Sequence, residues 1–243
     1  SAAVRAADGE TLLLSAARRN NVRFIAFLIG SAPWSDNSGK ASLISATLAT
    51  LGEYNQEVHE FQHMWQRVVD RLQKVRHRLF AEHRTTSLDA ISWLVMLVFH
   101  FIRLKIVCSA HSMVARLVTC EAIAARVRDM HTYLTYLEQQ DPDPSSTASA
   151  LEHLALQCDH DKEELLDIFK AKIKAEKWIP STEEGKVEAA SLLKHQICTQ
   201  RDKCSVELLS LMRSSLKKVR RVATETPLTV PKWFIPAHEL DSN

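Results

Sequence analysis

Residues 89–137 constrain the fold of this chain more than any other stretch. Their first half, Ile91 to Ile102, reads ISWLVMLVFHFI and is apolar almost all the way around a helix. Such a helix must be enclosed by other elements. Arg103 and Lys105 close the run before it reaches the roughly 20 residues of a membrane span. We therefore expect a buried core helix, followed after a Ser-rich break at 108–112 by a second helix along the chain.

Glycine is scarce in this sequence. Only 5 of the 243 residues are Gly, which disfavours both sheets with many tight turns and glycine-rich phosphate loops. The G-x-G-x-x-G, Walker and G-x-S-x-G motifs do not occur. The expected fold class is all-α, a multi-helix antiparallel bundle, and we expect no cofactor.

The net charge and the cysteines indicate which partners and which cellular compartment to expect. A net charge of +2 does not indicate a nucleic-acid partner, and it makes a membrane partner an unfavoured alternative. The 5 cysteines are odd in number and form no C-x-x-C pair. We therefore predict free thiols in a reducing compartment, with a cytoplasmic location, rather than disulfides or a zinc site.

The bundle itself is predicted over residues 42–222. From Ser42 to His83, apolar residues recur in steps of three and four, which predicts one long helix with a single buried stripe. The two Asp-Pro pairs near Asp141 predict an internal linker at 140–149. The residues 181–184 read STEE and predict a capping box in which Ser181 begins the next helix. The stripe comprises Leu51, Tyr54, Val58, Phe61, Trp65, Val68, Leu72, Val75 and Leu79.

The N-terminal residues 1–32 contain a pattern of their own. Asp8-Gly9, Thr11, Ala16-Ala17 and Asn20-Asn21 stand where an ankyrin repeat has its turn, first helix, packing face and inter-helix turn. The stretch resembles one ankyrin repeat, which implies a helical hairpin, and an unrelated amphipathic hairpin is the alternative. Residues 33–41 are rich in Ser, Asp, Asn and Gly and are predicted to be a linker.

The sequence His59-Glu60-Phe61-Gln62-His63 matches the H-E-x-x-H motif of zinc metallopeptidases. In that class the two imidazoles bind zinc and the glutamate is the general base. Phe61 lies on the apolar stripe, so the histidines two positions to either side should face solvent. We interpret them as a solvated pair and retain a zinc peptidase as the alternative.

Two further features have more than one interpretation. His100 lies within the apolar run and is interpreted as a neutral core histidine, with a ligand or pH switch as the alternative. The cations between Arg213 and Arg221 end the last predicted helix, where they suit the negative end of the helix dipole. An import signal or an acidic-surface contact is the alternative for this cluster.

The C-terminal residues 223–243 are predicted to be an extended segment, because three prolines interrupt residues 224–236. The apolar group Trp233, Phe234, Ile235 and Pro236 is expected to dock on a partner. With Glu239 and Leu240 it resembles the W-F-I-P-x-x-E-[VL] entry into the kinase domain of tyrosine-kinase-like protein kinases of microbial eukaryotes. The region from His100 to Leu137 is also similar to the helices that precede such kinases.

This resemblance implies a function for the chain. The ATP loop, the H-R-D loop and the D-F-G motif are absent from the 243 residues. The expectation is therefore a non-catalytic adaptor or regulatory region of a serine/threonine kinase of this type. Its partners would be proteins, including an adjacent kinase domain. The zinc peptidase and a membrane-active helical bundle are the two alternatives.

Overall fold

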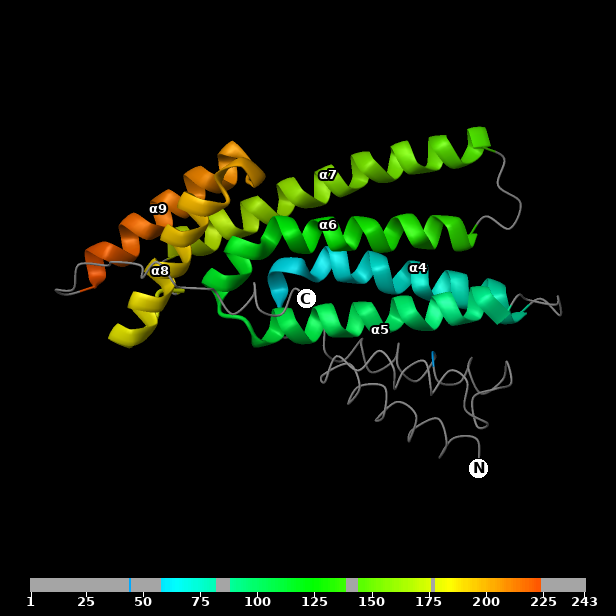
Figure 1. Cartoon of the computed structure of the whole chain (residues 1–243), viewed down its shortest axis with the longest axis horizontal. Coiled ribbons are helices and arrows are strands. Elements are labelled where there is room, and N and C mark those ends of the chain that lie inside the picture. The colour runs from blue at the N-terminus through cyan, green and yellow to red at the C-terminus, as the bar shows by residue number, and fades with distance from the viewer. Residues whose placement is uncertain (1–43, 45–57, 82–87, 139–143, 176–177, 224–243) are drawn as a thin grey trace, which may run out of the picture. The chain divides into compact units, whose positions relative to one another are not determined.

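The computed structural model describes residues 44, 58–81, 88–138, 144–175 and 178–223. Over these residues the fold is all-α: six α-helices and two short 3₁₀ helices, with no strand in the described part (Figure 1). The expectation of an all-α bundle is confirmed to that extent. The predicted ankyrin-like hairpin (1–32), the linker (33–41) and residues 224–243, with Trp233 to Pro236, lie outside the described residues.

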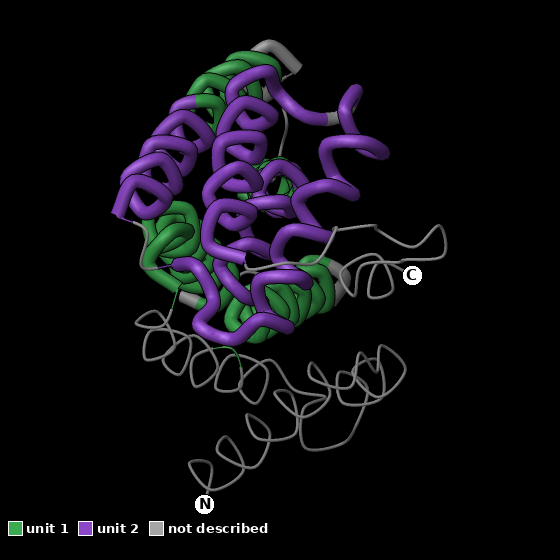
Figure 2. Tube along the Cα trace, turned by 90° about the vertical axis from the view of Figure 1, so that its left-hand side faces the viewer, with its two compact units in different colours: residues 1–110, 126–159 green, residues 111–125, 160–243 purple. Residues whose placement is uncertain are grey.

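The chain divides into two compact units, made of residues 1–110 with 126–159 and of residues 111–125 with 160–243 (Figure 2). The first unit contains η3 (His59–Phe61), α4 (Gln62–Ala81) and α5 (Leu88–Ala110). The second contains α8 (Glu183–Thr199), η4 (Arg201–Lys203) and α9 (Val206–Val222). The helices α6 (Met113–Glu138) and α7 (Pro144–Ala175) each contribute residues to both.

Helices α4 and α5 pack together and supply the aromatic core of the first unit. The Trp65 ring lies 5.4 Å from the Phe61 ring and meets Phe101 edge-on at 5.6 Å. The predicted apolar stripe is buried from Phe61 to Leu79. Continuous helix through residue 58 was a wrong prediction, because the Val58 backbone is not helical, with φ −125° and ψ 80°, and helix begins after it.

The apolar run forms α5, which is mostly buried as predicted. By length and composition alone α5 is the one helix among the described residues that could cross a membrane, over Ala90–Ala110. However, 61% of the apolar window lies buried inside the protein. The core helix of a soluble protein passes the same test, so length and composition alone do not identify α5 as a membrane span.

Helix boundaries in the structure follow local capping chemistry. The Ser112 hydroxyl accepts a hydrogen bond from the Ala115 amide at 3.2 Å, which starts α6 at the predicted break. Helix α7 begins at Pro144, inside the predicted linker 140–149. The linker prediction was therefore too long, because proline at the first helical position is preset for a helix.

Helix α8 begins one residue later than the predicted capping box requires. The cap is Thr182, whose hydroxyl accepts from the Gly185 amide at 3.2 Å. The third helical position is then Gly185 rather than a glutamate, so the reciprocal bond of a capping box is not made. A Cβ on Gly185 would lie 2.7 Å from the Pro180 Cβ, so the turn at Pro180 accepts only glycine there without a shift.

Candidate functional site: an aromatic surface on α5 and α6

Large aromatic side chains are exposed on one side of the first unit. Trp93 on α5 is 58% exposed, and Tyr133 on α6 is 51% exposed. Their rings stack at 6.3 Å with an interplanar angle of 12°. Tyr136, one turn further along α6, is also exposed. We call Trp93, Tyr133 and Tyr136 the aromatic surface.

A shallow apolar hollow of about 360 Å³ opens beside the stacked pair. This volume is near the lower end of the range for ligand and anchor pockets, roughly 300 to 1,000 Å³. The wall is almost entirely apolar, so it could receive an apolar side chain but offers few hydrogen bonds. Its lining residues are Ser92, Trp93, Met96, Leu97, His100 and Tyr133.

His100 lies at this hollow and is exposed. The interpretation of His100 as a core histidine was therefore wrong. Seven helical positions separate it from Trp93, which places both on the same outward side of α5. Partial burial, together with the positive charges of Arg103 and Arg126, lowers the pKa of His100. The imidazole is consequently neutral near pH 7 and adds polarity rather than charge to the hollow.

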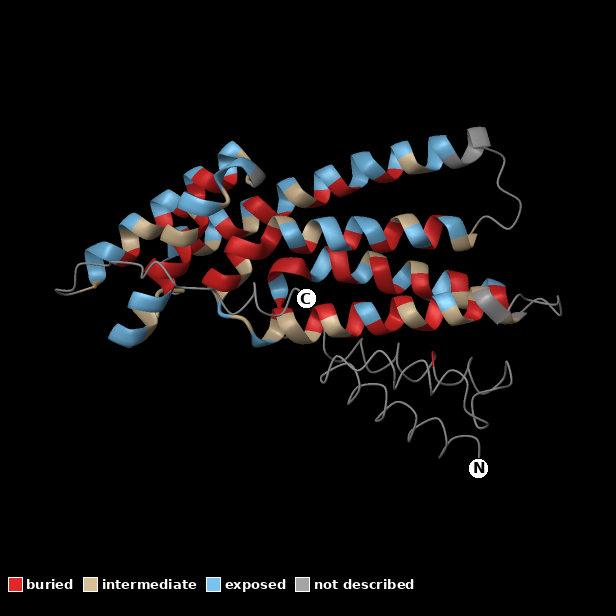
Figure 3. Cartoon of the chain, viewed as in Figure 1, coloured by how far each residue is buried: buried red, intermediate tan, exposed pale blue. Residues whose placement is uncertain are grey.

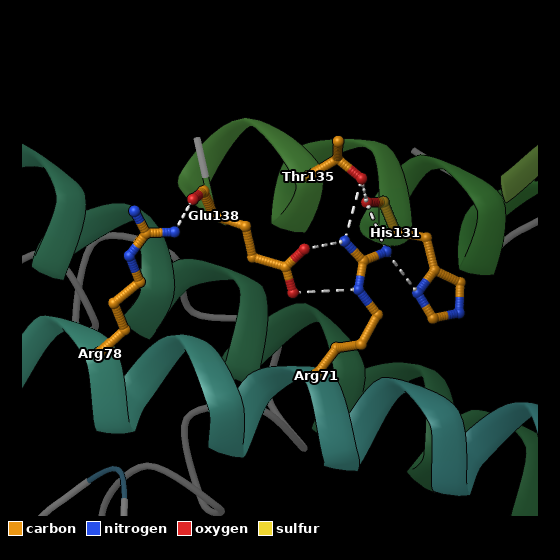
Figure 4. Close-up of polar contacts among 5 residues, drawn as sticks. All are labelled: Arg71, Arg78, His131, Thr135 and Glu138. Carbon is orange, nitrogen blue, oxygen red and sulfur yellow. Dashed lines mark hydrogen bonds and ion pairs between the residues drawn. The ribbon is translucent and has the colours of Figure 1, made fainter. Parts of the chain in front are cut away.

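Two arginines of α4, Arg71 and Arg78, contact the second half of α6 (Figure 4). The Arg71 guanidinium donates to both carboxylate oxygens of Glu138, at 2.8 and 3.3 Å. It also donates to the Thr135 hydroxyl at 2.9 Å and to the His131 carbonyl at 3.0 Å. Arg78 donates to the Glu138 carbonyl at the end of α6. We call Arg71, His131, Thr135 and Glu138 the arginine network.

The arginine network also sets the protonation state of His131. Arg71 can only donate, so the His131 Nδ1, 3.2 Å from it, must accept. That assigns the ring proton to Nε2 and requires a neutral imidazole. Burial, then the charges of Arg71 and Arg67, lower the pKa of His131 to about 4, which agrees with this assignment.

The network and the aromatic surface occupy different sides of α6. At about 100° per residue, positions 131, 135 and 138 share one side of the helix. Tyr133 and Tyr136 lie on the far side of the same turns. The inward ion pair therefore fixes the rotation at which α6 presents its tyrosines outward.

The H-E-x-x-H residues lie apart from this surface. His59 and His63 are both exposed, whereas the Glu60 side chain is 3% exposed. Residues 59–61 are 3₁₀ rather than α-helical, so the α-helical i,i+4 geometry that brings two imidazoles together is not present. Within the described ranges, no three His, Cys, Asp or Glu side chains are grouped so that they could hold a metal ion.

The cysteines of the described part are thiols. Cys108, Cys120 and Cys158 are buried and Cys198 is exposed. Burial, followed by the nearby Glu121 carboxylate, raises the pKa of Cys120. A thiol with a raised pKa and no solvent access is a poor nucleophile, so Cys120 serves as a core residue.

Sequence reasoning missed the aromatic surface. Trp93 sits within the apolar run that predicts burial, so nothing local marked it as exposed. A signal was present for α6, because its apolar residues at helical spacing, such as Met130 and Leu134, leave out Tyr133 and Tyr136.

Comparison with protein-family models, curated proteins and solved structures found no match to this chain.

Proposed function

We propose that this chain is a non-catalytic helical adaptor or regulatory region that acts through protein–protein contacts. The observation that carries the proposal is the stacked and exposed pair of Trp93 and Tyr133 beside an apolar hollow. Contiguous exposed apolar groups mark interaction sites more often than chance. Tryptophan and tyrosine are also the residues enriched at interface hot spots.

The setting of the pair supports an interface role over a folding role. Leaving two large rings half exposed gives up burial energy that an inward orientation would recover, about 25 cal/mol per Å². The rings are nevertheless held in a defined stack by α5, which is anchored in the core, and by the arginine network on α6. A preorganised apolar surface loses little entropy on binding.

The kinase connection is the finer part of the proposal and rests on the resemblance of Trp233 to Leu240 to a kinase-domain entry segment. The bundle would then position a following kinase domain and control its access to partners. The test compares phosphorylation by a protein that joins this chain to such a kinase domain with and without residues 42–222. An unchanged rate and unchanged partners would remove the regulatory role.

The interface itself is tested by variants of the described surface. Cross-linking in cells followed by mass spectrometry should recover proteins with the parent chain and lose them with the double variant Trp93→Ala/Tyr133→Ala. Leu156→Ala is the matched control, because Leu156 on α7 is 67% exposed but lies outside the aromatic surface. Equal loss with both variants, or no loss with the double variant, would contradict the proposal.

A further inference from the structure

The outward side of α9 carries four cations, which we call the basic stripe: Arg213, Lys217, Arg220 and Arg221. All four are exposed, and none has an ion pair within the part of the chain that the structure describes. They recur at helical spacing, so they form one line about 12 Å long. The opposite side of α9 is buried through Leu208, Met212 and Val219.

The helix dipole explains only part of this stripe. Arg220 and Arg221 lie in the last turn, where cations are favourable, but the effect fades within that turn. Arg213 and Lys217 lie further in. The fifth cation, Lys218, is already used, since its ammonium donates to the Ile173 carbonyl at the end of α7 at 3.0 Å. The neighbouring like charges of the stripe repel one another, so an uncompensated stripe is unfavourable.

The same unit presents the opposite charge on α7. Glu163, Glu164 and Asp167 are exposed, lie within one turn of each other, and form what we call the acidic face. Asp167 has an ion pair with Lys170 at 2.8 Å, but both side chains are largely exposed, at 73% and 49%. Such a surface pair contributes little and exchanges readily. Glu163 and Glu164 have no ion pair among the described residues.

We propose that the basic stripe of one copy of this chain binds the acidic face of α7 in a second copy. Both surfaces remain exposed within a single copy (Figure 3), so they do not neutralise each other there. Arg213 and Lys217 are four residues apart, as are Glu163 and Asp167, so two helices laid side by side can pair them. Because each copy carries both surfaces, a twofold arrangement makes the contact twice.

The second copy is favoured over other anionic partners by the surroundings of the stripe. Helix α9 has no aromatic residue on which nucleic-acid bases could stack. Helix α8, which packs against α9, exposes Glu183, Glu184 and Glu188. Exposed carboxylates on the neighbouring helix weaken the attraction of this unit for a broad anionic surface such as a membrane, whereas a single helix can pair with the stripe alone. This inference is independent of the adaptor role of the aromatic surface.

The test measures self-association of the full 243-residue chain by sedimentation equilibrium. In low salt, about 50 mM NaCl, the apparent mass should rise with protein concentration toward that of a dimer. The association constant should fall at least about tenfold in about 500 mM NaCl, because salt screens exposed charges. A chain that stays monomeric in low salt, or a dimer indifferent to salt, would overturn the proposal.

Charge reversal identifies the surfaces. The triple variant Arg213→Glu/Lys217→Glu/Arg220→Glu should be monomeric, and so should Glu163→Lys/Glu164→Lys/Asp167→Lys. A chain that carries all six changes should associate again, which shows that the reversed variants still fold. Arg128→Glu, at an exposed pair elsewhere, is the control and should leave association unchanged. Failure of the sixfold variant to associate, or binding of acidic peptides or anionic vesicles without self-association, would count against the second copy as partner.

Discussion

Replacing Arg71 by methionine tests the arginine network that positions α6. Methionine keeps an unbranched apolar stem, so the change removes the guanidinium while retaining much of the packing. The wild-type group makes five polar contacts with His131, Thr135 and Glu138. Their loss leaves the Glu138 carboxylate and the Thr135 hydroxyl without this donor.

The expected cost follows from burial. The side chains of Arg71 and Glu138 are only 20% and 21% exposed, so water replaces the lost contacts incompletely. Removing one partner of a fully buried pair costs about 3 to 5 kcal/mol, and partial exposure reduces that figure. We expect the free energy of unfolding to fall by about 2 to 3 kcal/mol.

Arg128→Met is the matched control for this prediction. Arg128 forms a similarly short ion pair with Asp159, at 2.7 Å, but those side chains are 48% and 65% exposed. Exposed ion pairs contribute at most about 1 kcal/mol and commonly less. The free energy of unfolding of this variant should therefore lie within about 0.5 kcal/mol of that of the parent chain. Urea denaturation followed by far-ultraviolet circular dichroism measures both. Equal effects of the two changes, or an Arg71→Met variant as stable as the parent, would refute the burial argument.

Three further predictions concern other parts of the described structure. Folding lowers the pKa of His131 from 6.5 to about 4, so the unfolded chain binds the imidazole proton more tightly than the folded chain does. The free energy of unfolding should therefore fall as the pH drops from 6.5 toward 4, by up to about 3 kcal/mol. Urea midpoints at a series of pH values should show this fall, and a His131→Gln variant with the same pH dependence would contradict it. Gly185→Ala should destabilise the chain by about 1 to 2 kcal/mol, although alanine is the better helix former, because the new Cβ would lie 2.7 Å from the Pro180 Cβ. Thermal unfolding measures this change. A variant more stable than the parent would show that the turn at Pro180 can shift to make room for the methyl group. Alkylation mapped by mass spectrometry should label the exposed Cys198 well before the buried Cys108, Cys120 and Cys158, whereas equal rates would indicate that the core opens readily.

Local sequence signals located most of the helices. The three-and-four spacing from Phe61 to Leu79 identified the buried side of α4, since that spacing is a property of the α-helix itself. The Ser-rich break predicted at 108–112 located the start of α6, where the Ser112 hydroxyl reaches an amide only three residues away. The cap of α8 was misplaced by one residue. Ser181 and Thr182 each offer a hydroxyl for the cap, and the structure uses Thr182.

By itself the sequence determined the class of fold, the buried sides of the helices and the absence of the common nucleotide-binding motifs. Tertiary structure alone decided that Trp93 faces outward within an apolar run and that it stacks on Tyr133, 40 residues later. It also decided that Arg71 bonds with Glu138 across 67 residues. The spacing of apolar residues depends only on neighbours within one helix. Which helix covers each side depends on packing between helices that are distant along the chain. The aromatic surface is the side of α5 and α6 that this packing left uncovered.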